Sequence, residues 1–199
     1  MNDSKRQLAF GKFDACNAED PNTVTVDGQQ QPKELVFAKR LTEAVMLLDP
    51  DASEPLRLAS RCQHICRWQV PRNTQPMGRA GYLKWRAGLK KFHAEKSAAI
   101  LEVVGYDAET VQRVQELNLK KNLKTDPDCQ TLEDALCLVF LGHQFDKLIA
   151  DTEEEKMLGI VRKTWAKMTP RGQQAAAALN FSEQAQAVLA KALGGEADS

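Results

Sequence analysis

Long apolar runs, a disulfide framework and a net charge are all missing from this sequence of 199 residues. No apolar run approaches the roughly 18 residues that span a bilayer, and the polar start MNDSKRQ lacks the hydrophobic centre of a signal peptide. We therefore expect a cytoplasmic protein with no membrane partner. The five cysteines are an odd number without CxxC spacing, which favours reduced thiols.

Charge is balanced overall but unevenly distributed along the chain. Lys and Arg number 27, as do Asp and Glu, so net charge gives no reason to expect a nucleic-acid coat. Residues 57–124 carry 14 basic and 5 acidic side chains, a net charge of +9, between flanks of −4 (residues 1–56) and −5 (residues 125–199). The segment 57–91 holds nine Lys or Arg and no acidic residue. Its charge suits a small anionic ligand, such as one that bears phosphate.

Strand signals are almost absent, whereas apolar residues recur at spacings of three and four, which predicts helices. The only β-like run, TVTV, is expected to be too short to found a sheet. The fold class predicted is all-α, a single-domain bundle of about eight or nine helices with N-terminal helices and a loop (1–52), a core (53–151) and C-terminal helices (152–199). The helices are expected over residues 8–17, 32–48, 53–70, 82–104, 107–119, 131–150, 153–168, a turn after 170, and 182–193.

Several local signals place the ends of these helices. Ser53 and Asp107 are expected N-caps, and Gly105 is expected to end the helix before it. Thr131 with Asp134 resembles a capping box that uses Asp in place of Glu.

The basic segment contains two rows of side chains at helical spacing. If both segments are helical, each row shares one face and carries one histidine and one aromatic ring. The rows are Arg57, Arg61, His64 and Trp68, and Tyr82, Arg86, Lys90 and His93. A loop over residues 71–81 adds further cations.

Guanidinium groups bind phosphate and carboxylate in a forked geometry, and aromatic rings can stack on a base. The candidate anion-binding residues are Arg61, Arg67, Arg72, Arg79, Arg86 and Lys90, and the candidate stacking residues are Trp68, Tyr82 and Trp85. The alternative is that the arginines coat a solvated face and that the tryptophans belong to the core.

Histidine is scarce, with three in the chain, and two of them lie in the basic segment. Together with Asp134 on an apolar helix, His64 and His93 form a candidate catalytic or metal-binding set. Imidazole and carboxylate are ligands for zinc, manganese, iron or magnesium, and such an ion can activate water for attack on phosphorus.

Specific motifs then identify the chain as a member of an uncharacterised bacterial and fungal family, the domain-of-unknown-function group four-two-zero-two. The motifs are RLASRCQHICRWQVPRNTQPMGRAGYLKWRAGLKKFHAEKSAAILEVVG, LNLKKNLK, LEDALCLVFLGHQF, FDACNAEDPN and PKELVFAKRL, so the resemblance covers nearly the whole chain. Membership of this family implies no particular activity.

A more distant resemblance is to the HD superfamily of metal-dependent phosphohydrolases, through His64, HAEKSAAILEVVGYDAETVQRV and LEDALCLVFL. It implies an HD-like helical fold in which His64 is the first ligand, His93 an accessory histidine and Asp134 the last ligand. The chain departs from the pattern where the His-Asp pair should stand, since YLKWRAGLKK contains neither residue. Either one divalent ion is held by His64, His93 and Asp134, with Glu95 as a further ligand, or lysines and arginines take over the electrostatic role of the metal.

Three functions follow from these observations as expectations. The first is an HD-like phosphohydrolase or related enzyme that acts on a small nucleotide or phosphorylated metabolite. The second is a non-catalytic anion-binding or nucleotide-binding protein with a degenerate HD-like site. The third is RNA binding through the basic surface.

Overall fold

Helices dominate the computed structural model, which describes residues 2–194. The predicted all-α class is confirmed. Residues Met1–Cys129 group into one compact unit and Gln130–Ser199 into a second. This boundary falls inside a helix.

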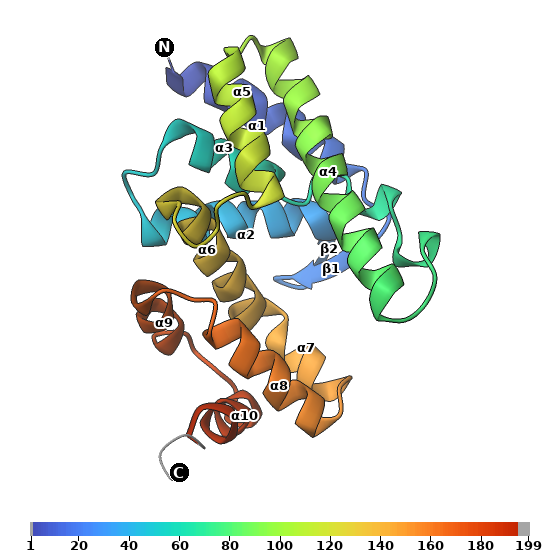
Figure 1. The fold of residues 1–199 in the computed structure, drawn as a ribbon, viewed down its shortest axis with the longest axis vertical. Coiled ribbons are helices and arrows are strands. Elements are labelled where there is room, and N and C mark those ends of the chain that lie inside the picture. The colour runs from blue at the N-terminus through green and yellow to red at the C-terminus, as the bar shows by residue number, and fades with distance from the viewer. Residues whose placement is uncertain (1, 195–199) are drawn as a thin grey trace. The chain divides into compact units, whose positions relative to one another are not determined.

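The first unit is built from five helices and a small hairpin (Figure 1). Helix α4 packs along α5, α3 lies against α2 and α5, and α1 contacts α2, α3 and α4. Buried side chains from all five helices form the core, among them Phe13, Leu41, Leu56, Leu101 and Leu117, none of which is exposed. The helices are α1 (Asn2–Ala18), α2 (Lys33–Leu48), α3 (Glu54–Cys62), α4 (Arg79–Val104) and α5 (Ala108–Leu119).

The TVTV run does form a strand, contrary to our expectation. Strand β1 (Thr23–Val26) pairs antiparallel with β2 (Gln29–Pro32), with Val26 opposite Gln29. Asp27 and Gly28, which join them, have φ angles of 51° and 77°. Positive φ at both central residues is the hallmark of the two-residue hairpin turn that Asp-Gly favours. The hairpin therefore forms because of its turn residues, although the TVTV run is short.

Three predicted helix ends in the first unit are confirmed. The Ser53 hydroxyl accepts a hydrogen bond from the backbone N–H of Leu56 at 3.2 Å, and the Asp107 carboxylate accepts one from Thr110 at 2.7 Å. Each bond satisfies a backbone donor that the helix itself leaves without a partner. Gly105 follows α4 with a φ of 87°, a conformation that favours glycine.

Helix α3 ends at Cys62, and the predicted helix through residue 70 is wrong. The chain continues in turns, with Cys66 at a φ of 52°, into the 3-10 helices η1 (Arg67–Gln69) and η2 (Arg72–Thr74). Ile65 is completely buried, and the side-chain oxygen of Asn17 accepts a hydrogen bond from the Cys66 N–H at 3.0 Å. These tertiary contacts outweigh local helix propensity. His64 and Trp68 consequently do not share a helix face with Arg57 and Arg61.

Helix α6 (Pro127–His143) starts in the first unit and continues in the second. Its N-cap is Asp126, whose Oδ1 accepts hydrogen bonds from the N–H groups of Asp128 at 3.1 Å and Cys129 at 3.3 Å. Pro127 suits the first turn because a proline needs no hydrogen-bond acceptor there. Thr131 and Asp134 therefore lie within the helix, and the predicted capping box is wrong.

The second unit continues with four shorter helices. The predicted helix over 131–150 is interrupted at Gln144, where φ is −125°, so the described residues contain ten α-helices rather than eight or nine. Helix α8 packs against α7 and α10. The helices are α7 (Phe145–Ala150), α8 (Glu154–Trp165), α9 (Pro170–Ala177) and α10 (Glu183–Leu193).

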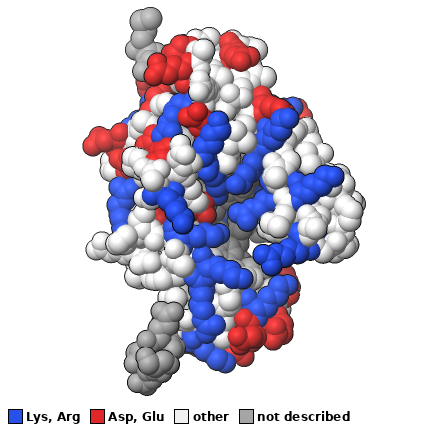
Figure 2. Space-filling model, viewed as in Figure 1, with Lys and Arg blue, Asp and Glu red and all other residues white. Residues whose placement is uncertain are grey.

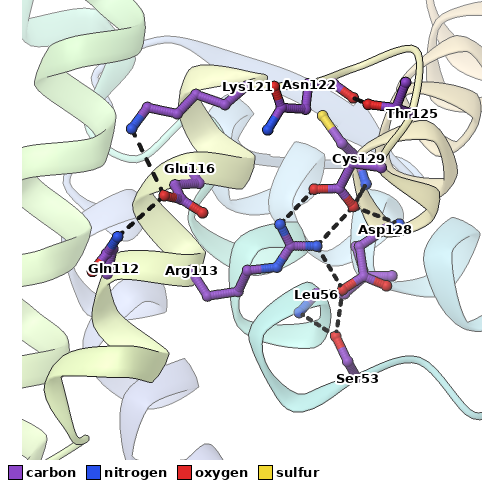
Figure 3. Close-up of polar contacts among 11 residues, drawn as sticks. Ser53, Leu56, Gln112, Arg113, Glu116, Lys121, Asn122, Thr125, Asp128 and Cys129 are labelled. Atoms are coloured by element: carbon purple, nitrogen blue, oxygen red, sulfur yellow. Dashed lines mark hydrogen bonds and ion pairs between the residues drawn. The ribbon is translucent and has the colours of Figure 1, made fainter.

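An arginine-centred network connects α5 with the start of α6 (Figure 3). Arg113 donates hydrogen bonds to both carboxylate oxygens of Asp126, at 2.5 and 2.7 Å, and to Asp128 at 3.2 Å. Ser53 donates to the same Asp128 oxygen at 2.8 Å. Arg113 lowers the pKa of the Asp126 carboxyl group, which keeps this carboxylate ionised.

A second polar contact fixes the start of the chain. The Glu54 carboxylate accepts a hydrogen bond from Arg6 of α1 at 2.6 Å and another from the Tyr106 hydroxyl at 2.8 Å. Glu54 thus holds α1 and the turn between α4 and α5 at the beginning of α3. Within residues 2–194, no helix is both long and apolar enough for a membrane span.

Candidate functional site

A cluster of titratable side chains in the first unit combines two of the predicted residues with one that was not predicted. We call Glu34, His64 and His93 the His64 cluster. The His64 Nδ1 atom lies 3.7 Å from the Glu34 Oε2 atom, and the two imidazole centroids are 5.8 Å apart. Phe37, one turn after Glu34 on α2, stacks on the His64 ring at 4.2 Å. Three segments meet here: the start of α2, the turns after α3, and the middle of α4.

Glu34 is a buried carboxyl group with a raised pKa. Burial raises this pKa from 4.5 to about 7, against the opposing charges of Arg67 and Lys33. Its Oε2 atom is buried without a hydrogen-bond partner among the described residues. A carboxyl group with a pKa near neutral pH can either donate or accept a proton. General acid–base catalysis requires this property.

The pKa values of both imidazoles are shifted in the opposite direction, downward. Burial, followed by the charge of Arg67, lowers the pKa of His64 well below its usual value. Burial likewise lowers the pKa of His93 to about 4. Both rings are therefore neutral at neutral pH. A protonatable acid thus lies beside two neutral bases.

The hydrogen bond of His93 indicates which of its two ring nitrogens carries the proton. Its Nδ1 atom lies 2.9 Å from the Ile65 carbonyl oxygen, which can only accept, so we assign the proton of the neutral ring to Nδ1. The Nε2 atom then carries a lone pair, and it is buried with no partner in the part of the chain that the structure describes. Buried polar atoms without a partner are uncommon and ask for an explanation.

Two further buried oxygens without a partner belong to the surroundings of the cluster. They are Oε1 of Gln63, the neighbour of His64, and Oδ1 of Asn118 on α5. The Asn118 amide donates to Ser97, one turn beyond His93 on α4, at 3.0 Å. The His64 side chain is 25% exposed, so it is the member of the cluster with most contact with solvent.

Arg67 is the predicted cation that accompanies the cluster. Its charge acts on Glu34, His64 and His93 alike. The guanidinium lies over the Trp85 ring at 5.2 Å, and no carboxylate within residues 2–194 pairs with it. Stacking on an indole leaves the N–H groups in the guanidinium plane available for an anion. Lys33 and Lys120 add positive charge near His64.

The other candidate cations have different partners. Arg61 forms a two-pronged salt bridge with Asp14, with both N–O distances at 2.7 Å. Arg72 donates to the carbonyl oxygens of Gln75, Pro76 and Gly78 and so shapes its own loop. Arg79 and Arg86 are exposed on α4, and Lys90 on the same helix is half-buried. Lys and Arg side chains are widespread on the face that Figure 2 shows.

The predicted stacking residues also differ in their surroundings. Trp85 is half-buried, and its indole N–H donates to the Val70 carbonyl oxygen at 2.9 Å. Tyr82 is 43% exposed and lies 6.0 Å from Trp85, centroid to centroid. Trp68 is half-buried in η1. Trp85 therefore positions Arg67, which sequence spacing did not suggest.

Asp134 is a buried residue of the second unit with hydrogen bonds to Thr169. Its carboxylate accepts hydrogen bonds from the Thr169 N–H, at 2.9 Å, and from the Thr169 hydroxyl, and it is completely buried. Thr169 is the N-cap of α9, and a side chain at Gly172 would overlap with the Asp134 carboxylate. The contacts described for Asp134 thus stabilise the start of α9.

The predicted metal ligands do not fit a shared ion. Among the described residues, no group of three or more His, Cys, Asp or Glu side chains could hold one. Asp134 is engaged by Thr169, and Glu95 is 63% exposed and lies 3.6 Å from Lys91 on the same helix.

Glu34 is the member of the His64 cluster that sequence reasoning missed. It lies in PKELVFAKRL. A charged residue directly after Pro32 and Lys33 is typical of the exposed first turn of a helix. The signal that could have found it is Phe37, since apolar residues three positions away imply a buried face.

Comparison with known proteins gives one match. The family model described as "Domain of unknown function (DUF4202)" matches residues 7–189. No curated protein and no solved structure matches the chain. The matched residues include every member of the His64 cluster as well as Arg67 and Trp85. The chain therefore belongs to the DUF4202 family.

Proposed function

We propose that the first unit binds a small phosphate-bearing anion, a nucleotide or a phosphorylated metabolite, at the His64 cluster and hydrolyses it by general acid–base catalysis. One observation carries the proposal: a carboxyl group and an imidazole lie together with their pKa values displaced in opposite directions. Pairs of this kind are characteristic of catalytic acids and bases. An HD-like relationship agrees with this reaction but is not needed for it.

The proposed chemistry assigns roles to His64, to Glu34 and to the nearby cations. Neutral His64, which is partly exposed, accepts a proton from the attacking water. Protonated Glu34 donates its proton to the oxygen of the leaving group. Arg67, held flat against Trp85, and the nearby Lys33 and Lys120 offset the negative charge that develops on the phosphoryl oxygens. Cations thus supply the electrostatic stabilisation that metal ions provide in other phosphohydrolases.

A second candidate function is binding of the same anion without hydrolysis. The observation that favours it is the poor fit of the candidate metal ligands, since phosphate hydrolysis is slow without strong charge stabilisation. The ligand and its site are the same in both cases, and only turnover distinguishes them.

The experiment measures binding and turnover on the same variants. Titration calorimetry with AMP, ATP and inorganic phosphate should detect binding to the wild type. Arg67→Met should weaken it by about 10-fold to 100-fold, because hydrogen bonds to charged groups contribute about 1.5–3 kcal/mol. Lys39→Met is the matched control, since it removes one exposed positive charge from α2, the helix that carries Glu34.

Turnover separates the two functions. Release of inorganic phosphate from AMP or ATP should be lost in Glu34→Gln and in His64→Ala, whereas binding persists in Glu34→Gln. Binding without phosphate release in the wild type would favour the second function. If none of the three compounds binds, or if Lys39→Met and Arg67→Met weaken binding equally, the proposal is wrong.

A further inference from the structure

Two cysteines that the proposed chemistry does not use lie together at the end of α1. The Cys16 thiol is one of the groups that act on the Cys66 thiol, although the residues are far apart in the sequence. The neighbouring Asn17 binds the Cys66 backbone N–H at 3.0 Å, which anchors the two segments to each other. Asn17 therefore holds the end of α1, with Cys16, against the segment that carries Cys66.

The two thiols differ in access. Cys16 is half-buried and lines a pocket of about 450 Å³ between α1 and α4, together with Lys12, Ala15, Lys96, Ala99, Ile100 and Val103. Cys66 is only 1% exposed. Burial raises the pKa of the Cys66 thiol to about 11, so this thiol stays protonated. A reagent from solvent therefore reaches Cys16 first.

The backbone at Cys66 is unusual. Its φ of 52° lies in the left-handed region, which few residues other than glycine adopt. Such conformations persist only where surrounding contacts enforce them, and they concentrate at functional sites. Here the conformation occurs one residue before Arg67 and two residues after His64.

We propose that Cys16 and Cys66 form a redox-active dithiol that a hydroperoxide converts into a disulfide. In the first step the Cys16 sulfur attacks one peroxide oxygen, the O–O bond breaks, and Cys16 sulfenic acid and water form from hydrogen peroxide. In the second step the Cys66 sulfur displaces the hydroxyl group of the sulfenic acid, which leaves as water with the Cys66 proton. The two thiols lose two electrons in total, and the peroxide gains them.

The pocket suits the first step. Lys12 and Lys96 line it together with Cys16, and reactive cysteines occur in electropositive, partly exposed surroundings. Lys96 also acts on Cys66, against the effect of burial. The disulfide would tie the segment that carries His64 and Arg67 to α1. This inference does not depend on the proposed hydrolysis.

Oxidation of the full chain by hydrogen peroxide tests the inference. The five thiols of the wild type should fall to three, a peptide pair linking Cys16 with Cys66 should appear in mass spectra without reductant, and dithiothreitol should reverse both changes. Cys16→Ser should abolish the cross-link and keep four thiols. Cys62→Ser, which removes another buried thiol, is the matched control and should still form the cross-link.

Trapping of the intermediate supplies the second readout. In Cys66→Ser the sulfenic acid has no resolving thiol, so dimedone should label Cys16 several-fold more than in the wild type. If Cys66→Ser does not fold, the wild type and Cys16→Ser still decide the question. A cross-link at other cysteines, or oxidation of Cys16 to sulfinic acid without any cross-link in the wild type, would overturn the inference.

Discussion

The Nδ1 atom of His64 lies 3.7 Å from the Oε2 atom of Glu34, close to it but too far for a hydrogen bond. The gap leaves both atoms available to a third partner. Because no hydrogen bond from His64 stabilises the charged form of Glu34, burial is the main influence on the pKa of Glu34.

Glu34→Gln should change how stability depends on pH. The folded pKa, about 7, lies above the unfolded value of 4.5, so the folded state holds the proton more tightly and unfolding becomes easier as pH rises from about 4.5 to 7. The groups that act on Glu34 are His64, Arg67, Lys33 and Asp20. Between pH 5 and pH 8 the variant should gain about 2 kcal/mol in unfolding free energy relative to the wild type.

Urea unfolding at several pH values measures this difference. His93 and His64, whose pKa values are lowered, contribute in the opposite direction in both proteins, so only the comparison isolates Glu34. The control is Glu95→Gln, at a position that is 63% exposed. Parallel stability curves for wild type and Glu34→Gln would contradict the prediction.

Arg61→Met should reduce stability without weakening the binding of ATP. The variant leaves Asp14 without its two-pronged partner in a half-buried setting, which costs about 1–3 kcal/mol. A double-mutant cycle with Asp14→Asn, followed by urea unfolding, measures the coupling between the two side chains. Weaker ATP binding in Arg61→Met would show instead that Arg61 contacts the ligand.

Trp85→Phe should weaken binding of ATP by about 3-fold to 10-fold. Phenylalanine lacks the N–H that bonds to Val70 and stacks less strongly on a guanidinium, so Arg67 loses its fixed orientation. Tyr82→Phe keeps an aromatic ring at the neighbouring position and serves as the control. Calorimetry checks both variants, and equal affinities for ATP would rule out a positioning role for Trp85.

Asp134→Ala should destabilise the second unit by about 2–4 kcal/mol. It removes the acceptor for the Thr169 N–H and hydroxyl and leaves a void beside Gly172. Gly172→Ala should also destabilise the second unit, because its side chain would collide with the same carboxylate. Asp151→Ala, in an exposed turn, is the control, and amide hydrogen exchange in α9 measures the effect.

Local signals predicted most helix ends because caps depend on neighbouring residues. Ser53, Asp107 and Gly105 act at the positions where the sequence placed them. The predictions from sequence were wrong where a tertiary contact or a turn outweighed the periodicity of apolar residues. Asn17 draws Cys66 out of the helix after α3, and Asp27 with Gly28 converts a short run into a hairpin.

The site was only partly predictable for the same reason. His64 and His93 do lie together, but not through the helical spacing that suggested them, since His64 lies beyond the end of α3. Arg67 and Arg61 look alike in sequence, and only the position of Asp14 neutralises one of them. Glu34 is buried by contacts from segments far along the chain, which no local pattern records.

The contact between Arg6 and Glu54 makes the first turns of α1 part of the folded unit. A shortened chain that starts after residue 6 would leave the Glu54 carboxylate with Tyr106 but without a positive counterpart. Tags and fusions at this end therefore need a spacer that preserves the helix, and a truncation intended to help crystallisation would instead lower the melting temperature.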